Sequence, residues 1–302
     1  MMQDRPLLGI LLMLGFCILA PLGDSLAKLL GQSVPLVVLL LARFAVQAVL
    51  LFPLVWATGR PWRMSGRTHA LAWIRTLLHI VGIGAMFTAL QYLPLADAVA
   101  IAFVMPFIML ILGHYVLGEE IGFRRIAACL VGFIGTLLVI QPAFDAVGWP
   151  ALLPLVVAVV FSFFMLVTRA MAKTIDPIGL QAVNGVMATV ILAPVLLLFG
   201  NTGPEILALR APDGTEWTML IAIGVIGTMA HLLMTWSLRY APSATLAPMQ
   251  YLEIPFATFM GWLIFSDLPN PLASLGILIT ISAGLYIVMR ERATSRAAPP
   301  AA

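Results

Sequence analysis

A carboxylate stands in the middle of an apolar segment that is long enough to cross a lipid bilayer. The segment runs from Ala241 to Asp267, and Glu253 lies midway along it, between Pro248 and Pro255. A charge inside a membrane is costly, so such an acid usually faces a cavity or a partner. Each proline frees a backbone carbonyl upstream, which could line the same cavity. We expect Glu253 to carry a coupling proton or to contact a cargo; a structural ion pair or hydrogen bond is the alternative.

Two histidines fall near mid-depth of two other apolar segments. His79 lies in the stretch 70–92, and His231 lies in the stretch 217–240. An imidazole can pass a proton near neutral pH or bond a polar cargo. A hydrogen bond between two helices explains either residue equally well, so both interpretations stay open.

Arg43 is the deepest arginine, eight residues into the stretch 35–56. Its planar guanidinium could bind an anionic group of a cargo. It could equally neutralise Glu253 or Asp24, or extend to the membrane surface. Asp24 itself stands one turn before Lys28, which favours an internal ion pair over contact with a cargo.

Neutral polar side chains complete the candidate site. Asn184 and Gln250 could contact a cargo, and Gln250 precedes Glu253 by three residues, which places both on one helix face. Arg75 shares a face with His79 but lies near the end of its segment, so we expect it to reach the lipid headgroups. The aromatic residues that could stack on a planar cargo are Tyr92, Phe103, Trp236 and Tyr240. Aromatics near the ends of spans are more often interface anchors.

The composition requires a membrane to position these residues. Of the 302 residues 62% are hydrophobic and only 10% are charged, whereas soluble proteins carry about 25% charged residues. The chain is therefore an integral membrane protein, and its formal charge of +3 gives no reason to expect nucleic acid as a partner. Cys17 and Cys129 fall in apolar runs and predict no disulfide or metal site. We expect no cofactor and no metal.

Ten apolar stretches are long enough to span a bilayer. They are 7–30, 35–56, 70–92, 95–117, 123–141, 149–170, 177–199, 217–240, 243–265 and 271–290. The first could pass for a signal peptide, but it lacks a convincing cleavage site, and we interpret it as a retained span. Twelve of the 16 basic residues fall on the side of the N-terminus and only Arg210 lies in the opposite loops. This asymmetry predicts that both termini are cytoplasmic.

The two halves of the chain repeat at an offset of 148 residues. Matched residues include Met86 with Met234, Tyr92 with Tyr240, Pro94 with Pro242, Gly113 with Gly261 and Glu119 with Asp267. Met105 falls opposite Glu253. Because five spans per unit is an odd number, the second unit enters the membrane from the opposite side. Inverted repeats are typical of transporters, with the substrate site near the midplane between the halves.

The same residues resemble a known family. The run from Ala89 to Glu119, with Tyr92-Leu-Pro near its start and Leu117-Gly-Glu at its end, resembles the EamA repeat of the drug/metabolite transporter superfamily. The second copy is similar but ends at Asp267, where glutamate is usual. The resemblance implies a ten-helix bundle with a central cavity lined by spans one to four and six to nine. Spans five and ten would be peripheral.

The sequence thus predicts an all-α membrane protein of two inverted five-helix EamA repeats around a central cavity. We assign 1–141 to the first repeat, 149–290 to the second and 291–302 to a cytoplasmic tail. The resemblance implies a secondary transporter of the bacterial inner membrane. Its cargo would be a small organic metabolite, amphipathic or heterocyclic, such as the vitamin riboflavin, and protons could drive it. An exporter of amino acids or drugs is the alternative, and the chain could form a homodimer.

Two other classes fit less well. A membrane-embedded enzyme would need a catalytic motif, and the sequence contains no H-E-x-x-H and no G-x-S-x-G. A Walker motif is also missing, which argues against ATP as the direct energy source. A structural scaffold would leave Glu253 and the repeat unexplained.

Overall fold

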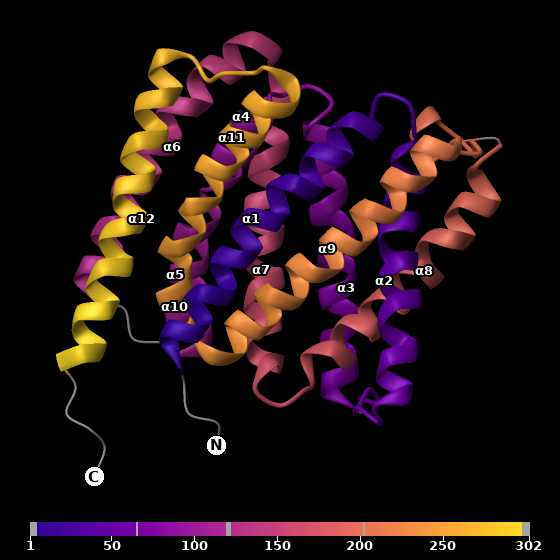
Figure 1. Cartoon of the computed structure of the whole chain (residues 1–302), viewed down its shortest axis with the longest axis horizontal. Coiled ribbons are helices and arrows are strands. Elements are labelled where there is room, and N and C mark those ends of the chain that lie inside the picture. The colour runs from indigo at the N-terminus through magenta and orange to yellow at the C-terminus, as the bar shows by residue number, and fades with distance from the viewer. Residues whose placement is uncertain (1–4, 65, 119–121, 202, 298–302) are drawn as a thin grey trace.

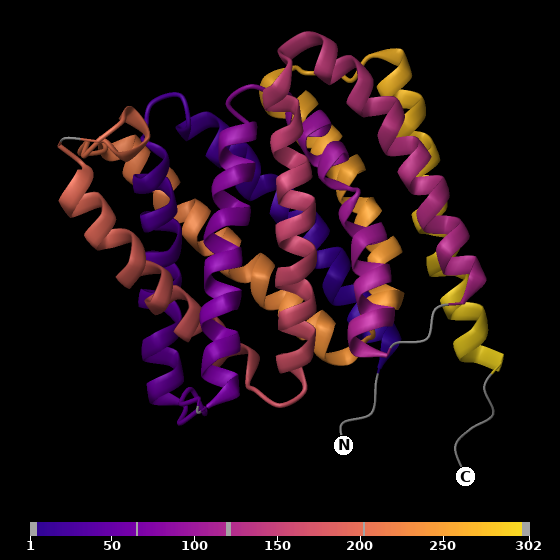
Figure 2. The ribbon, with the colours of Figure 1, turned by 180° about the vertical axis from the view of Figure 1, so that it is seen from behind.

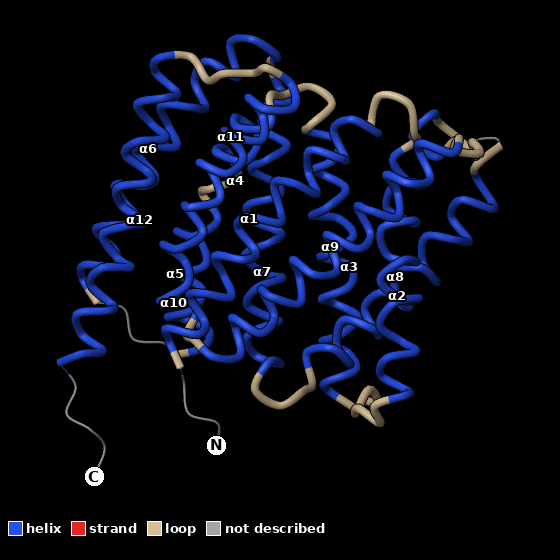
Figure 3. The backbone as a smooth tube through the Cα atoms, viewed as in Figure 1, coloured by secondary structure: helices blue, strands red, loops and turns tan. Residues whose placement is uncertain are grey.

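The computed structural model describes residues 5–64, 66–118, 122–201 and 203–297. Figure 3 shows helices joined by short loops, with no strand in this described part of the chain. The α-helices are α1 (Pro6–Leu30), α2 (Leu36–Ala57), α3 (Arg67–Ala89), α4 (Leu95–Ala102), α5 (Met105–Leu117), α6 (Phe123–Val147), α7 (Leu153–Ala172), α8 (Pro177–Phe199), α9 (Gly214–Tyr240), α10 (Ser243–Leu246), α11 (Glu253–Phe265) and α12 (Pro271–Ala297). Short 3₁₀ helices are η1 (Trp149–Leu152), η2 (Glu205–Leu207) and η3 (Ala247–Leu252).

Eight helical stretches within the described residues are long and apolar enough to cross a membrane. One of them runs through α4 and α5 together, and the apolar part of α12, Pro271–Ala283, is shorter. The predicted span 243–265 is divided among α10, η3 and α11, so no single helix there reaches about 20 residues. Large apolar side chains such as Trp56 and Leu197 lie exposed on the outside of the bundle, as lipid-facing side chains do.

Two helices are broken at corresponding places. α5 and α11 each contain 13 residues, begin 148 residues apart at Met105 and Glu253, and end before residues with positive φ, Gly118 (66°) and Ser266 (58°). α6 and α12 also begin 148 residues apart. The offset read from the sequence therefore recurs in the helix boundaries. Glu119, which belongs to the repeat motif, lies outside the described residues.

The helices pair across the two halves of the chain. α1 packs along α9 and α3 packs along α7, while α2 packs on α8 and α6 on α12. Figure 1 shows the N- and C-terminal ends on the same side of the bundle, with α6 and α12 at one edge and α9 crossing diagonally. From behind, α7 stands between α3 and the α4–α5 pair (Figure 2). α12 continues to Ala297, so the segment after residue 290 begins as helix.

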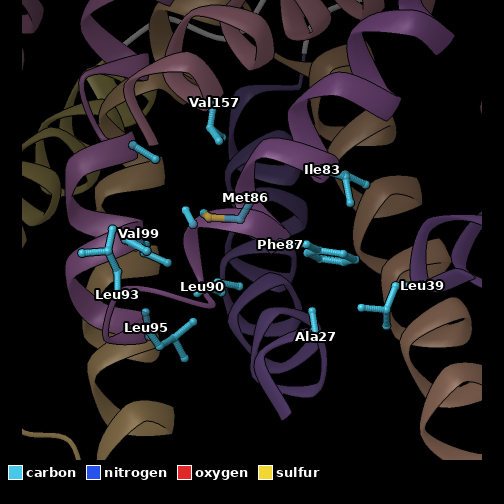
Figure 4. Packing of buried hydrophobic residues seen from close by; sticks show 14 of the residues in the cluster. Ala27, Leu39, Ile83, Met86, Phe87, Leu90, Leu93, Leu95, Val99 and Val157 are labelled. Atoms are coloured by element: carbon cyan, nitrogen blue, oxygen red, sulfur yellow. The ribbon is translucent and has the colours of Figure 1, made fainter. Parts of the chain in front are cut away.

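The largest apolar cluster fills the space between α1, α2, α3, α4 and α7. Its members include Ala27, Leu39, Phe87, Val99 and Val157, which are nearly or fully buried (Figure 4). Small and β-branched side chains along α4 allow it to be buried on all sides. This packing holds the broken helix α4–α5 against α11 and fixes the position of the break.

Candidate functional site

A cavity opens between mid-depth and the end of the bundle opposite the termini. Its lining comes from α1, α2, α3, α4, α5, α7, α9 and α11, and none from α8, the predicted seventh span. Counting all space between atoms, it measures about 730 Å³, but the centre of a water molecule can occupy only about 80 Å³ of that. This space is large enough for several water molecules. A vitamin-sized cargo therefore requires side chains or helices to move apart.

The cavity brings together three charged residues predicted from the sequence. Asp24, Arg43 and Glu253 all line it. Asp24 interacts electrostatically with both Arg43 and Glu253. Neither carboxylate makes a hydrogen bond or ion pair of contact distance with any described residue. Asp24 thus interacts with one base, Arg43, and one acid, Glu253. Glu253 begins α11, where the positive end of the helix dipole favours a negative charge.

Arg43 is held by a hydrogen-bond network behind the cavity. Its Nη1 donates to Gln47 Oε1 at 3.0 Å, and its Nη2 lies 3.1 Å from His231 Nδ1. Gln47 donates to the carbonyl of Gln181 at 2.7 Å, and Gln181 donates to Thr235 at 3.1 Å. The network ties α2 to α8 and α9.

The guanidinium of Arg43 lies flat against Gly227 of α9. A Cβ atom at residue 227 would overlap the Nε and Cζ atoms of Arg43. Only glycine leaves room for the arginine in this position. Neither Gln47 nor Gly227 was selected from the sequence, since a glutamine or a glycine in an apolar run carries no signal until its neighbour is known.

His79 and His231 meet although they are not equivalent in the repeat. Their ring centroids are 4.3 Å apart. His231 lines the cavity, whereas His79 is fully buried behind it. His79 Nδ1 lies 2.7 Å from Asn184 Oδ1, and Asn184 donates to Thr76 at 2.8 Å. Asn184 therefore supports His79 rather than lining the cavity, and both readings of the histidines stay open.

Arg75 contradicts its prediction. We expected it to reach the headgroups, but it is fully buried, and its Nε donates to Thr168 at 2.8 Å. Its guanidinium carbon lies 4.5 Å from the centre of the Phe164 ring. The Nη1 and Nη2 atoms have no partner among the described residues, which costs at least about 1–3 kcal/mol. The position of Arg75 along the sequence did not show that its face of α3 points into the bundle.

Gln250 also differs from its prediction. It is fully buried but does not line the cavity; its amide nitrogen lies 3.1 Å from the Met165 sulfur, and its Oε1 has no partner among the described residues. The segment Ala247–Leu252 is a 3₁₀ helix, so the expected α-helical face, shared with Glu253, does not form there.

The predicted pair of Asp24 and Lys28 does not form. Lys28 Nζ donates to the carbonyl of Leu93 at 2.9 Å and pairs with Asp267 at 3.4 Å. Asp24 faces Arg43 instead. Lys28 therefore ties the first half of the chain to the second near the mouth of the bundle, away from the termini.

Aromatic side chains form much of the cavity wall. Of the four aromatic candidates from the sequence, only Phe103 lines it, and Tyr92 is 53% exposed on the surface. The other aromatic residues in the wall are Phe16, Phe87 and Phe161. Phenylalanine is common in apolar spans, so its position in the sequence alone gave no reason to select these three. A wall of phenyl rings with a few charges is suited to a flat, partly polar molecule.

These features define a class: a multi-pass helical membrane protein with a mainly apolar central cavity and a few charged side chains near mid-depth. No group of three metal-ligating side chains lies together in the described part of the chain.

Comparison with known proteins agrees with this class. The model of the EamA-like transporter family matches residues 7–141 and again 148–290. The chain is 27% identical to a riboflavin transporter of Brucella anthropi, covering 88% of this chain and 92% of that protein. It is 24% identical to an S-adenosylmethionine uptake transporter of Rickettsia felis (89% and 88% covered) and 25% identical to the pseudopaline exporter CntI of Pseudomonas aeruginosa (90% of each).

One solved crystal structure matches the fold with a TM-score of 0.71 at 19% identity, covering 95% of this chain and 98% of that one. The chain belongs to the EamA-like transporter family. The resemblance seen in the sequence is confirmed, and the protein is a transporter of a small metabolite rather than an enzyme.

Proposed function

We propose that this protein carries a flat heterocyclic metabolite, riboflavin or a close analogue, across the bacterial inner membrane. The observation that carries the proposal is the cavity, where four phenylalanines surround Arg43, His231, Asp24 and Glu253. The rings would stack on a planar cargo while the polar groups bond its edge. Three relatives that carry the name riboflavin transporter, at 26–28% identity, support the choice of cargo.

Ten spans in two inverted repeats form the architecture of this proposal. The pairing of the helices supports it. If each helix is replaced by its counterpart in the other repeat, the α1–α9 pair becomes the α7–α3 pair. The α2–α8 and α6–α12 pairs each join two counterparts and therefore stay the same. The broken helices at Met105 and Glu253 fit the discontinuous helices that line transporter sites. Repeat boundaries at 1–141 and 149–290, with a tail at 291–302, complete the assignment.

Both termini lie in the cytoplasm in our proposal, because basic residues concentrate on their side. The cavity then faces the outside of the cell, and the Gln47–Gln181–Thr235 network closes the cytoplasmic side. A proton on Glu253 would remove its repulsion with Asp24, the acid that interacts with Arg43, and we therefore place the coupling at Glu253.

Uptake of labelled riboflavin into proteoliposomes tests this function, together with growth of a riboflavin-requiring bacterium at low vitamin concentration. We expect saturable uptake that stops when excess unlabelled riboflavin is added. The proposal fails if neither uptake nor growth depends on the protein.

S-adenosylmethionine is the second candidate. When both Asp24 and Glu253 are ionised, the cavity lining carries one more acid than base, which would suit a cationic cargo such as a sulfonium. The relative from Rickettsia felis adds support. Competition in the same uptake assay separates the candidates, because only the true cargo will displace the label at low concentration.

A further inference from the structure

Three polar groups without partners lie together behind the cavity, toward the end where the termini lie. They are the Nη1 and Nη2 atoms of Arg75, Nε2 of His79 and Nε2 of His231. The three side chains are at least 93% buried, and none of these atoms bonds any described residue. Leaving buried polar groups unbonded is costly. Three such groups in one place therefore indicate a ligand that binds them in another conformation.

The three side chains are neighbours. The ring of Phe164 lies 4.5 Å from the guanidinium carbon of Arg75 and 4.6 Å from the ring of His79. The rings of His79 and His231 are 4.3 Å apart. Because His231 also lines the cavity, this region is the next place a cargo reaches on its way through the bundle.

The hydrogen bonds of His79 fix which of its nitrogens carries the proton. Thr76 donates to the carbonyl of Ala72, which can only accept, so Thr76 in turn accepts from the Asn184 amide. The Oδ1 atom of Asn184 then accepts from His79, which places the proton on Nδ1. The Nε2 atom of His79 is left as a hydrogen-bond acceptor.

His231 has the opposite arrangement. Its Nδ1 lies 3.1 Å from Arg43 Nη2 and 3.0 Å from the carbonyl of Gly227. Arginine can only donate, so the contact with Arg43 requires a lone pair on Nδ1, and Nδ1 accepts from Arg43. The proton of His231 is on Nε2, which is therefore a hydrogen-bond donor.

Arg75, His79 and His231 thus offer a donor, an acceptor and a donor. The complementary ligand edge presents an acceptor, a donor and an acceptor, which is the O=C–NH–C=O group of an imide. We propose that these three residues bind the imide edge of the cargo once the two halves of the protein move and open this region to the cavity.

This inference rests on the proposed function and names the part of the cargo that the protein recognises. The isoalloxazine ring of riboflavin carries such an imide edge on its pyrimidine ring. The adenine of S-adenosylmethionine has an amino donor beside a ring acceptor and lacks the acceptor–donor–acceptor pattern. The array therefore selects a flavin over an adenosyl compound, independently of the charges in the cavity.

The test compares riboflavin with its N3-methyl derivative in wild-type proteoliposomes. Methylation removes the imide N–H and places a methyl group against the His79 acceptor, so we expect uptake to fall at least about tenfold. Arg75→Met should slow riboflavin uptake to a similar degree. It should leave the thermal midpoint of the purified protein unchanged or higher, because it removes an unsatisfied buried charge.

Arg43→Met is the matched control. This change removes the interaction partner of Gln47, His231 and Asp24, so the thermal midpoint of the variant should fall. Equal uptake of the two flavins would overturn the proposal, as would an Arg75→Met variant that loses as much stability as the control. If the wild type transports neither flavin, riboflavin is the wrong cargo. Thermal stabilisation by uridine but not 3-methyluridine would then support the array, and equal or absent stabilisation would refute it.

Discussion

The two broken helices share a geometry and differ in chemistry. α5 begins at Met105 and α11 at Glu253, both starting residues line the cavity, and both helices are followed by a residue with positive φ. The first residue of α5 carries a thioether, whereas the first residue of α11 carries a carboxylate. The break is thus a property of the repeat, whereas the acid is particular to the second half.

This difference separates what the fold requires from what transport requires. At the second break the N–H of Glu253 bonds the carbonyl of Gln250 in the preceding 3₁₀ helix, so the backbone there does not depend on the acid. Arg43 and Asp24, which line the same cavity, likewise come from the first half only, and Asp24 interacts electrostatically with Glu253. The charged site is therefore asymmetric within a repeated framework, and changes at the two breaks should have unequal effects.

The largest effect is expected from Glu253→Gln. It keeps the shape of the side chain but removes the charge and the exchangeable proton, so transport should fall about 100-fold, as when a charge-assisted contact is lost. Initial uptake rates in proteoliposomes, with and without an imposed pH gradient, measure this. Glu253 is structural if the variant keeps the rate and the pH dependence of the wild type while reaching the membrane normally.

Placing a second acid at the matching break should also be harmful. Met105→Glu buries a carboxyl group without a partner, at a cost of about 2 kcal/mol, equivalent to a roughly 30-fold loss of transport. The thermal midpoint should fall as well. Met105→Leu is the control, because a swap of similar volume costs less than about 1.5 kcal/mol. Normal activity of the glutamate variant would show that the two breaks are interchangeable.

Two glycines in the cavity wall allow a finer comparison. Gly227→Ala forces Arg43 aside, and we expect about a tenfold loss of transport from this overpacking. At Gly23 an added Cβ meets only the Ile226 side chain at 3.7 Å, an ordinary contact. Gly23→Ala should therefore transport like the wild type. Equal losses in the two variants, measured as uptake rates, would mean that the position of Arg43 is unimportant.

The sequence predicted the framework well because hydropathy and repetition are properties of whole segments. The offset of 148 residues returned in the boundaries of α5, α6, α11 and α12. Glu253, Arg43, Asp24 and His231 were candidates because polar side chains are rare inside spans, and all four line the cavity. Asp24 lies there near Arg43 and not in the expected pair with Lys28.

Contacts between helices were harder to predict, because they depend on how each helix is rotated about its own axis and on how deep each residue lies in the membrane. His79 lies twelve residues after the start of α3 and His231 nine before the end of α9, and these two ends face the same side of the bundle. Residues of similar depth meet there even though the repeat offset does not relate them. Arg75 lies on the face of α3 that points into the bundle, and it is therefore buried. Lys28 pairs with Asp267, 239 residues away in the sequence, instead of with Asp24.

The smallest effect is expected at Gln250, where sequence and structure disagree most about a candidate site residue. The structure gives its amide only weak sulfur contacts and leaves Oε1 unbonded. Gln250→Leu should then change transport by less than about twofold and leave stability equal or higher, since an unsatisfied oxygen is removed. Uptake rates and thermal midpoints measured beside Glu253→Gln decide the matter. A loss as large as that of the acid would mean that Gln250 turns toward the cargo in another conformation, and that the second break contributes two polar side chains to the pathway instead of one.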